Sequence, residues 1–351
     1  MAQADACRRM AAEISAHGAS RRRWMRAVPL LATALWLPPA LAVPGIVQSS
    51  RTLMGTRVDI TVDGADARIA GAAVDAAWAE MTRLADMMSR YRLGNPVHAL
   101  QLSAGLQPVA VPTEMMRVLE KGQDRAVQSG GAFDMTIGAL TGWRFDRPDP
   151  VIPAADEIAR ELPLVGYRDL LLDSKRQTAL LRRRGMRVDL GGIAKLPILQ
   201  AGMAMLGAHG VGAAMINGGG DVLVSGQLRG RDWRIGVRNP LAPATLLGVL
   251  RVSGHMVVAA SGDYERGFTV GGRRYHHILD PDTGMPEQRM RGVVLVARDV
   301  DAVNGLGPAV MVAGQTAGRR WLDAMQGVDA LTVDGSGQRW MSAGMRARLA
   351  V

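Results

Sequence analysis

The chain has 351 residues, and its 48% hydrophobic and 21% charged content is typical of a folded globular protein rather than a disordered one. The formal net charge of +10 comes almost entirely from arginines spread along the chain, since lysine occurs only at positions 121, 175 and 195. No basic tract is interleaved with aromatic residues, which make up only 4% of the chain, so the charge does not indicate nucleic-acid binding.

The N-terminal segment, residues 1–42, has the pattern of an export signal. A twin-arginine pattern at 21–23 precedes an apolar run over 27–41, which ends in the small-x-small cleavage pattern of 40–42. This run is shorter than the roughly 20 apolar residues that a transmembrane helix needs, which favours a cleaved signal over an uncleaved anchor. The only cysteine, Cys7, precedes the run, and a mature chain without cysteine suits an oxidising compartment. We expect a periplasmic protein that meets the membrane only through its signal or a membrane-bound partner.

The rest of the chain, residues 43–351, is predicted to mix strands and helices. Alternating apolar and polar residues predict strands, and apolar residues at spacings of three and four predict helices. In chain order we expect a strand pair over 47–62, helices over 66–88 and 113–128 (the second capped by Thr113), a surface excursion over 147–165, two strands within 170–189, a helix over 195–208, strands over 213–222, 233–238, 247–252, 255–260 and 292–297, and a helix start over 304–312. The absence of regular βαβ alternation or of a fixed repeat favours a mixed α/β or α+β domain.

Two glycine-bearing loops follow predicted strands and display polar residues. Asp189-Leu190-Gly191-Gly192 leads into the helix that begins at Lys195, and glycine at a helix start lets backbone N–H groups approach phosphate. The strand from 213 ends in Gly218-Gly219-Gly220 between Asn217 and Asp221. Each loop alone is weak support for a phosphate site, because an acid before Gly-Gly is also a common turn former.

The stretch 261–286 holds the densest group of polar side chains. Gly271-Gly272 lies between polar and aromatic runs, which predicts a hairpin that folds 264–266 back beside 275–277. Neighbouring strand residues face opposite sides, so only one of His276 and His277 can enter a site. The alternative is an ordinary surface hairpin.

Taken together, these loops resemble the FAD:protein FMN transferases (ApbE-like proteins). The matching segments are Met54-Gly55-Thr56, Met88-Ser89-Arg90-Tyr91, and the segments 131–138, 189–195, 217–221, 233–240, 261–266 and 275–286. They come in the family's order, and the resemblance covers roughly 47–314, about three quarters of the chain. The resemblance implies an α+β fold with one catalytic domain over 43–351, built of mixed, mostly antiparallel sheets and flanking helices. The export signal is also similar to that of the branch linked to nitrous oxide reduction (NosX-like).

The resemblance implies a periplasmic enzyme that splits FAD at its pyrophosphate. It would move FMN onto a Thr or Ser hydroxyl of an acceptor flavoprotein and release AMP, with Mg²⁺ assisting. Such a site needs backbone donors, cations and a base for the attacking hydroxyl, and we expect His277 as base and Lys195 as cation. The expected FAD-binding residues are Met54, Tyr91, Asp134, Asp189, Gly191, Gly192, Lys195, Asn217, Gly219, Asp221, Ser261, Asp263, Tyr264, His276 and His277. The two tyrosines would flank the flavin or adenine rings, and Asp134 and Asp221 would hydrogen-bond them.

The chain departs from the family's pattern in two places. Segment 94–99 contains no carboxylate where active members usually carry an acid that helps to hold the nucleotide. The family's metal site, an Asp with a Thr four residues later, falls on Asn304 and Pro308, which offer one neutral side-chain oxygen between them. Asp301 is a candidate replacement, and Ala194 completes the candidate magnesium ligands.

These departures leave two alternative functions. The first is a non-catalytic maturation factor for a periplasmic respiratory system, which binds FAD or the acceptor protein without transferring FMN. The second is an FAD pyrophosphatase, which passes the phosphoryl group to water. The sequence separates transferase from binder through one question, whether a carboxylate reaches the metal position.

Overall fold

The computed structural model describes residues 45–64, 66–145 and 149–350. The expected export signal at 1–42 therefore lies outside the described residues. Contacts between Cα atoms join Val43–Val351 into one compact unit. Within the described ranges, no helix combines the length and the apolar character that crossing a membrane requires.

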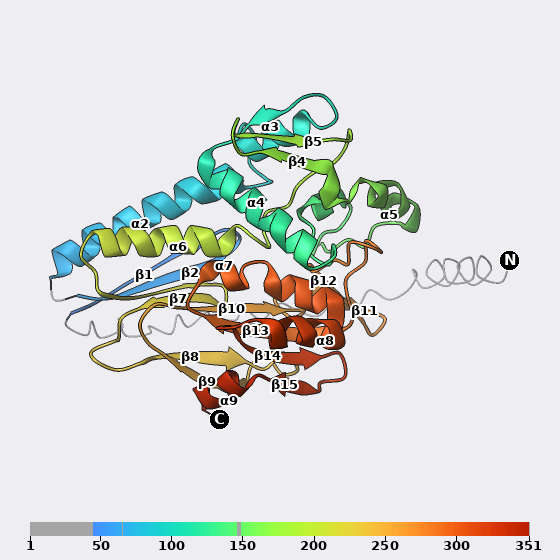
Figure 1. The fold of residues 1–351 in the computed structure, drawn as a ribbon. Helices are drawn as coiled ribbons and strands as arrows, with labels where there is room; N and C mark the ends of the chain where they lie inside the picture. The colour runs from blue at the N-terminus through green and yellow to red at the C-terminus, as the bar shows by residue number, and fades with distance from the viewer. Residues whose placement is uncertain (1–44, 65, 146–148, 351) are drawn as a thin grey trace, which may run out of the picture. The chain divides into compact units, whose positions relative to one another are not determined.

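An eight-stranded sheet forms the centre of this unit (Figure 1). Its strand order is β1-β2-β6-β7-β10-β13-β14-β15, and every neighbouring pair runs antiparallel. The strands are β1 (Ile46–Leu53), β2 (Thr56–Asp63), β6 (Ala213–Gly218), β7 (Asp221–Ser225), β10 (Met256–Gly262), β13 (Met290–Ala297), β14 (Asp329–Asp334) and β15 (Arg339–Met341). This arrangement confirms the expected α+β fold with mostly antiparallel sheets.

The two faces of the central sheet pack against different layers. On β7, Leu223 belongs to the core under the helices, whereas Val222 and Val224 belong to a second core, because successive strand residues face opposite sides. The second core is shared with a small sheet, whose strands are β16 (Leu349–Ala350), β9 (Leu246–Val252) and β8 (Trp233–Arg238). Trp233 anchors it, since its buried indole N–H donates to the Ser225 carbonyl at 3.2 Å. The period-two pattern predicted for 233–238 is thus confirmed.

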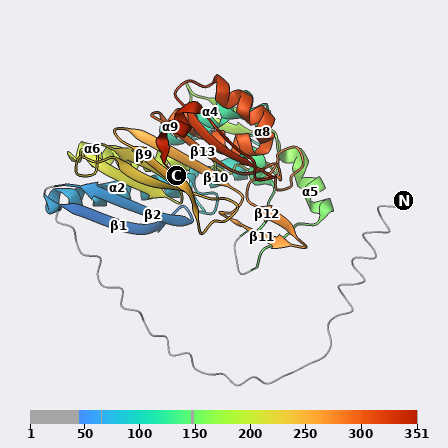
Figure 2. The same ribbon diagram turned by 90° about the horizontal axis from the view of Figure 1, so that it is seen from below.

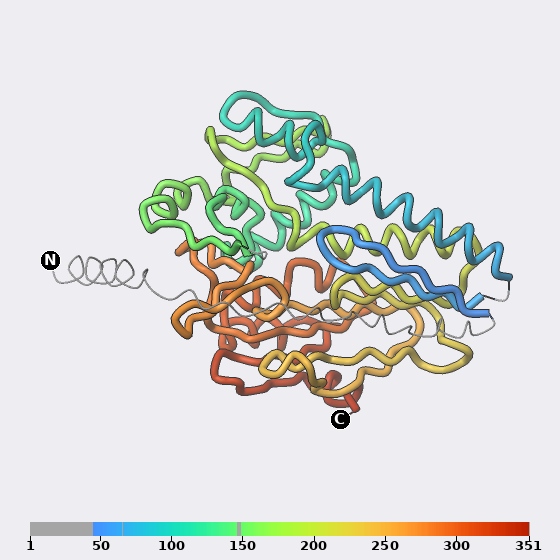
Figure 3. The backbone as a smooth tube through the Cα atoms, turned by 180° about the vertical axis from the view of Figure 1, so that it is seen from behind, coloured from blue at the N-terminus to red at the C-terminus, as the bar shows by residue number. Residues whose placement is uncertain are grey.

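Helices α2 and α6 lie side by side over the other face of the sheet, and Figure 3 shows the β1–β2 hairpin (blue) beside them. Asp66 caps α2 by accepting the backbone N–H of Arg68 at 2.8 Å. The helices are α2 (Ala67–Met88), α3 (Pro96–Leu102), α4 (Thr113–Gln128), α5 (Ala155–Glu161), α6 (Lys195–Ala208), α7 (Val300–Val303), α8 (Leu306–Ala324) and α9 (Ala343–Arg348), with 3₁₀ turns η1 (Met135–Ala139), η2 (Leu162–Leu164) and η3 (Tyr167–Asp169). The strands of a further small sheet are β3 (Val109–Ala110), β5 (Thr178–Leu181) and β4 (Leu170–Asp173).

The hairpin predicted around Gly271-Gly272 is present as β11 (Gly267–Val270) and β12 (Arg273–His276), and it lies near α5 (Figure 2). Both glycines take positive φ, +56° and +75°, which a two-residue hairpin turn of this kind requires. The pairing is shifted from the prediction. Only Arg266 of the segment 264–266 lies beside the second run, where its carbonyl accepts the His277 N–H at 3.1 Å.

Two local predictions, at Thr113 and Asn304, are wrong, and the surface excursion expected over 147–165 contains a helix that was not predicted. Thr113 is the first residue of α4, and Pro112 stands at the cap without a side-chain hydrogen bond. The expected excursion contains the regular helix α5, whose first turn carries two acids that favour a helix N-terminus. Asn304 does not start a helix, because it is the residue that follows α7, and Gly305 with φ +69° separates it from α8.

Candidate active site

An ion pair joins the two glycine-bearing loops. Lys195 begins α6 and Asp221 begins β7, and the Lys195 Nζ lies 2.6 Å from the Asp221 Oδ2. The Asp221 side chain is only 8% exposed, while that of Lys195 is 28% exposed. The second oxygen of Asp221 accepts the Ala260 N–H at 2.9 Å. The carboxylate is therefore satisfied within the protein, and the ammonium of Lys195 keeps the more open position at the surface.

The loop before α6 is held by Asp189. One oxygen of Asp189 accepts the Gly191 N–H at 2.8 Å, and the other pairs with the Arg90 guanidinium at 2.7 Å. Gly191 and Gly192 are exposed, and the N–H of Gly192 has no hydrogen-bond partner within the described residues. An exposed backbone donor beside a lysine at a helix start is suited to a phosphate oxygen. Arg90 was not among the expected site residues, although its place before Tyr91 in a matching segment pointed to it.

The turn between β6 and β7 packs against the turn between β1 and β2. A Cβ on Gly219 would lie 2.4 Å from the Thr56 Oγ1, and Gly219 has a φ of +62°, so both space and backbone conformation require glycine. Asn217 stabilises its own turn by accepting the Gly220 N–H at 3.1 Å. Met54 takes a positive φ of 53° in the other turn. The expected residues at these two turns are thus brought together by β2–β6 pairing.

The two adjacent histidines lie in different environments, as strand alternation predicted. His277 is half-buried, and its Nδ1 lies 3.3 Å from the Arg266 carbonyl oxygen. A carbonyl only accepts, so Nδ1 carries the proton and Nε2 keeps its lone pair. Burial, together with the charges of Arg266 and Lys195, lowers the pKa of His277 to about 4. The imidazole is therefore neutral at pH 7 and able to accept a proton, within the electrostatic reach of Lys195.

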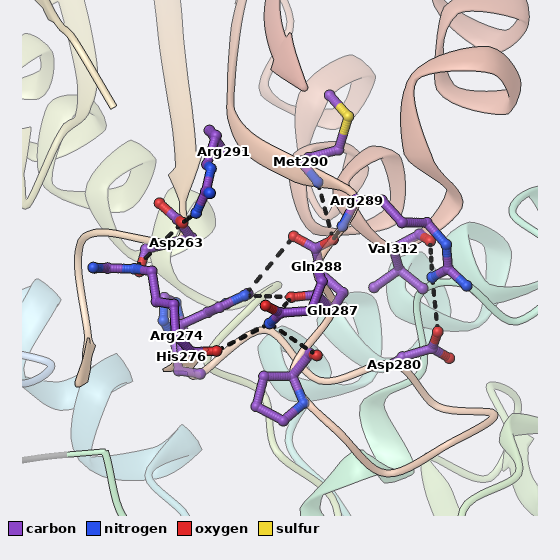
Figure 4. Close-up of polar contacts among 12 residues, drawn as sticks. Asp263, Arg274, His276, Asp280, Glu287, Gln288, Arg289, Met290, Arg291 and Val312 are labelled. Carbon is purple, nitrogen blue, oxygen red and sulfur yellow. Dashed lines mark hydrogen bonds and ion pairs between the residues drawn. The ribbon is translucent and has the colours of Figure 1, made fainter. Parts of the chain in front are cut away.

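His276 and Asp263, both expected to bind FAD, belong instead to a buried polar network (Figure 4). His276 is 1% exposed and its Nε2 lies 2.6 Å from the Glu287 carbonyl. Asp263 is 3% exposed and pairs with Arg291 at 2.9 Å and with Arg274 at 3.3 Å. Neither side chain is open to a ligand, because each points into the base of the hairpin. Their interactions hold the ends of β10, β12 and β13 together.

A buried acid in this network, Glu287, escaped the sequence prediction. Its carboxylate accepts the Arg289 N–H at 2.6 Å and the Met290 N–H at 3.2 Å at the start of β13. Burial raises the pKa of Glu287 to about 7. Nothing in the local pattern signals this burial, since the residue directly follows an ordinary turn sequence. Its two hydrogen bonds connect the turn after residue 286 to the start of β13.

Asp134 is placed differently from the expectation that it contacts a ring. It is 7% exposed and caps η1, with one oxygen accepting the Thr136 N–H at 2.7 Å and its hydroxyl at 2.6 Å. The other oxygen accepts the Tyr167 N–H at 2.7 Å. Burial raises the pKa of Asp134, while these hydrogen bonds oppose the rise. The carboxylate thus orders the loop that contacts Asp189, since the Met135 carbonyl accepts the Asp189 N–H.

The two candidate ring-flanking tyrosines differ in exposure. Tyr91 is 74% exposed, with the Arg90 guanidinium 5.2 Å from the centre of its ring. Tyr264 is half-buried, and its ring packs on the backbone of Gly262, where a Cβ would lie 2.3 Å from it. Burial raises the pKa of Tyr264 to about 12, so it remains protonated. Tyr91 is free to stack on a planar ligand as it stands, whereas Tyr264 offers one face of its ring at most.

The α7–α8 junction adjoins the Gly192 loop. A Cβ on Gly192 would lie 4.0 Å from the Pro308 Cγ, and one on Gly307 would lie 2.4 Å from the Ser261 Oγ. Ser261 therefore lies at this junction, as expected for a site residue. A separate cavity of about 400 Å³ lies between α8 and β15 and is lined by none of the expected residues.

The candidate magnesium ligands do not form a cation site. Asn304 is 2% exposed and uses its amide Nδ2 to donate to the Ile193 carbonyl at 2.8 Å. Pro308 has no side-chain oxygen, and the Ala194 carbonyl already accepts the N–H of Ile198 in α6. Across the described part of the chain, no three His, Cys, Asp or Glu side chains are grouped closely enough to hold a metal ion.

Asp301 does not replace the missing carboxylate. Its side chain is 62% exposed and its Oδ2 lies 3.8 Å from the Lys121 Nζ of α4. The residue sits in the first turn of α7, where its N–H is capped by Asp299 at 3.0 Å. The expectation that Asp301 replaces the missing carboxylate is therefore not supported, because its carboxylate is directed to Lys121 of α4.

Comparison with known proteins agrees with the arrangement of these loops. The model of the ApbE family matches residues 54–332. The chain belongs to the ApbE family. The resemblance inferred from the separate loops is thereby confirmed.

Named relatives extend this result. An FAD:protein FMN transferase of Klebsiella pneumoniae (strain 342) is 33% identical over 220 residues, covering 62% of this chain and 68% of the relative. One of Treponema pallidum (strain Nichols) is 31% identical over 286 residues, covering 76% and 78%. The crystal structure of the ApbE protein from Thermotoga maritima superposes with a TM-score of 0.79 at 27% identity, covering 87% of this chain and all of that one.

Proposed function

We propose that this ApbE family member is an FAD:protein FMN transferase. The observation that carries the proposal is the Lys195–Asp221 ion pair, which holds two glycine turns together within electrostatic reach of a neutral His277. The exposed Gly192 N–H, the Lys195 ammonium and the imidazole nitrogen of His277 are the kinds of group that phosphoryl transfer needs from a protein. Named relatives with the same activity support it.

In the proposed reaction, a Thr or Ser hydroxyl of an acceptor flavoprotein attacks the FMN phosphorus of FAD. A new P–O bond forms to the acceptor, the P–O–P bridge breaks, and the AMP phosphate leaves with the bridging oxygen. His277 Nε2 takes the hydroxyl proton, because Nδ1 is occupied by the Arg266 carbonyl. The Gly192 N–H and Lys195 would bind pyrophosphate oxygens, and Tyr91 would cover a ring; the support is the unpaired Gly192 N–H and the exposed Tyr91 side chain.

The resemblance to the family also implied a magnesium ion. The residues present at the expected metal position do not favour it. Mg²⁺ prefers carboxylate oxygens, and the position where the family carries an Asp holds an amide that is already hydrogen-bonded. We therefore assign no step of the reaction to a metal held by Asn304, Pro308, Asp301 or Ala194. The transfer assay described below compares Mg²⁺ with EDTA and so measures whether the transfer needs Mg²⁺.

We also propose that the protein works in the periplasm. The support is the pattern of residues 1–42, with paired arginines, a short apolar run and a small-x-small site. Its acceptor would then be a periplasmic or membrane-bound flavoprotein of a respiratory system. Replacing Arg21 and Arg22, the pair that precedes Arg23 and Trp24, together by Lys should retain the protein in the cytoplasm. Unchanged periplasmic recovery would refute twin-arginine export.

A transfer assay tests the proposed function. Purified protein is mixed with FAD and an acceptor protein that presents a Thr or Ser flavinylation motif, with either Mg²⁺ or EDTA. A fluorescent acceptor band on a denaturing gel, with the mass increase of bound FMN and one AMP released per transfer, is the expected result. FMN and AMP release without acceptor labelling would indicate a pyrophosphatase. FAD binding with neither product would indicate a non-catalytic binding factor.

A further inference from the structure

The side-chain amide of Asn304 connects the junction between α7 and α8 to the loop 189–195 that precedes α6. Asn304 follows α7 and precedes Gly305, whose φ of +69° turns the chain into α8. Its Nδ2 donates to the Ile193 carbonyl at 2.8 Å, across 111 positions of the chain. Because Asn304 is 2% exposed, water does not compete for this hydrogen bond.

A buried guanidinium fastens the same junction from the other side. Arg125 of α4 is 5% exposed, and its Nε donates to the Asn304 carbonyl at 3.0 Å. Its Nη2 donates to the carbonyls of Asp301 and Ala302 at 3.3 and 3.2 Å. The guanidinium thus caps the C-terminus of α7 with a fixed positive charge. No acid forms an ion pair with Arg125 among the described residues, and its hydrogen bonds to this junction all go to carbonyl oxygens.

These contacts make the junction a poor binding site for a divalent cation. The Ile193 carbonyl is occupied by an N–H, and turning the amide over would set two oxygens against each other. The neighbouring Arg125 charge would repel a cation in a region of low dielectric, where such repulsion is strong. Pro308 contributes no donor, and the Asp301 carboxylate is directed to Lys121.

We propose that Asn304 is a positioning residue that takes the place of a resident cation. Its amide holds the loop 189–195 against the α7–α8 junction, so that the exposed Gly192 N–H is ordered without a divalent ion. The inference rests on the proposed function only in taking this loop as the place where the FAD pyrophosphate binds. In this protein the Asn304–Ile193 hydrogen bond forms on folding and connects the two segments. The order of the loop 189–195 without FAD is therefore independent of magnesium.

Melting temperature measured with Mg²⁺ and with EDTA tests the proposal without any turnover. The wild-type protein should melt at the same temperature in both, within about 1 °C. Asn304→Asp removes the donor and places a carboxylate against the Ile193 carbonyl, so it should melt about 3–8 °C lower in EDTA. Mg²⁺ should restore part of that loss, because the new carboxylate offsets the Arg125 charge and a ligand that binds only the folded state stabilises it. The matched control Asp301→Asn should show no response to Mg²⁺, like the wild type.

Hydrogen exchange keeps the test open even if Asn304→Asp folds poorly. In the wild type, protection of the amides of 189–195 should be equal in Mg²⁺ and in EDTA. In Asn304→Ala these amides should exchange faster, to the same extent in both conditions. Protection or melting of the wild type that depends on magnesium would overturn the proposal. If Asp301→Asn removed that response, Asp301 would be a ligand of the ion. Failure of FMN transfer alone would overturn the proposed function and leave this result unchanged.

Discussion

The Lys195 ammonium and the Asp221 carboxylate meet at 2.6 Å and join the start of α6 to the start of β7. The pair is unequal, because the carboxylate is almost fully buried while the ammonium reaches solvent. Lys195 thus has two tasks, to neutralise a buried acid and to present positive charge beside the Gly192 loop. Each task has its own measurable consequence.

A double-mutant cycle measures the first of these tasks. Lys195→Met should lower the free energy of unfolding by about 1–3 kcal/mol, less than for a fully buried pair because water reaches the ammonium. Adding Asp221→Asn should recover part of that loss, since the buried charge is removed while the amide oxygen still accepts the Ala260 N–H. Urea denaturation gives both values. If the double variant loses as much as the sum of the single ones, the pair contributes no coupling.

Activity should depend on His277, and stability on His276. His277→Ala should slow FMN transfer by roughly 10²–10⁴-fold through loss of the general base, with little change in urea midpoint. His276→Ala should cost about 2–4 kcal/mol of unfolding free energy, because it empties a buried position and leaves the Glu287 carbonyl without its partner. Initial rates and denaturation curves on the same preparations check both. The reverse pattern would show that the wrong histidine has been assigned to the reaction.

The pH dependence of stability should reveal Glu287. Its folded pKa of about 7 lies above its unfolded value of 4.5, so the folded state retains a proton that the unfolded state has lost. This contribution is therefore full below pH 4.5 and lost as pH rises to about 7, a change of roughly 3 kcal/mol. His277, with a folded pKa of about 4 below its unfolded 6.5, acts in the opposite direction between those values.

Glu287→Gln isolates the carboxyl contribution while keeping an oxygen for the Arg289 and Met290 N–H groups. Relative to the wild type, this variant should gain unfolding free energy steadily from pH 4.5 to 7. Urea curves at intervals of pH measure the difference. A constant difference across that range would mean that Glu287 titrates in the folded protein as it does in the unfolded chain.

Tyr91 should affect binding without affecting folding. Because the side chain is 74% exposed, Tyr91→Ala should change the unfolding free energy by about 0.5 kcal/mol or less. Loss of ring stacking should weaken FAD binding by roughly 3–10-fold, and Tyr91→Phe should retain wild-type affinity. Titration of FAD fluorescence measures the affinity. Equal affinity of all three proteins would remove Tyr91 from the site.

The contact between Gly219 and Thr56 makes a stability prediction with an internal control. Gly219→Ala should cost about 2–4 kcal/mol, since it strains a φ of +62° and forces Cβ to within 2.4 Å of the Thr56 Oγ1. Gly210→Ala shares the positive φ, +80°, but meets nothing within 4 Å, so it should show the backbone penalty alone. Equal losses in the two variants would mean that the turns separate without cost.

The sequence by itself determined the local elements and the family. Helix α2, strand β8 and the Gly271-Gly272 hairpin follow from apolar spacing and turn chemistry, which depend on residues close together in the chain. The glycine loops could be identified for the same reason, because a turn requires particular backbone angles whatever surrounds it. Arg125 was also within reach, since it lies three residues after Gly122 on the buried stripe of α4.

Only the tertiary structure decided which polar groups face a ligand. Asp134, Asp263 and His276 are as polar as Lys195 or His277, yet the fold turns them inward and satisfies them with internal partners. Asn304 and Ile193 meet across 111 positions, and Arg125 and Asn304 across 179. Burial and long-range hydrogen bonds depend on packing between distant segments, which no local pattern encodes. The assignment of Asn304 to a hydrogen bond rather than to a cation therefore depended on the position of Ile193.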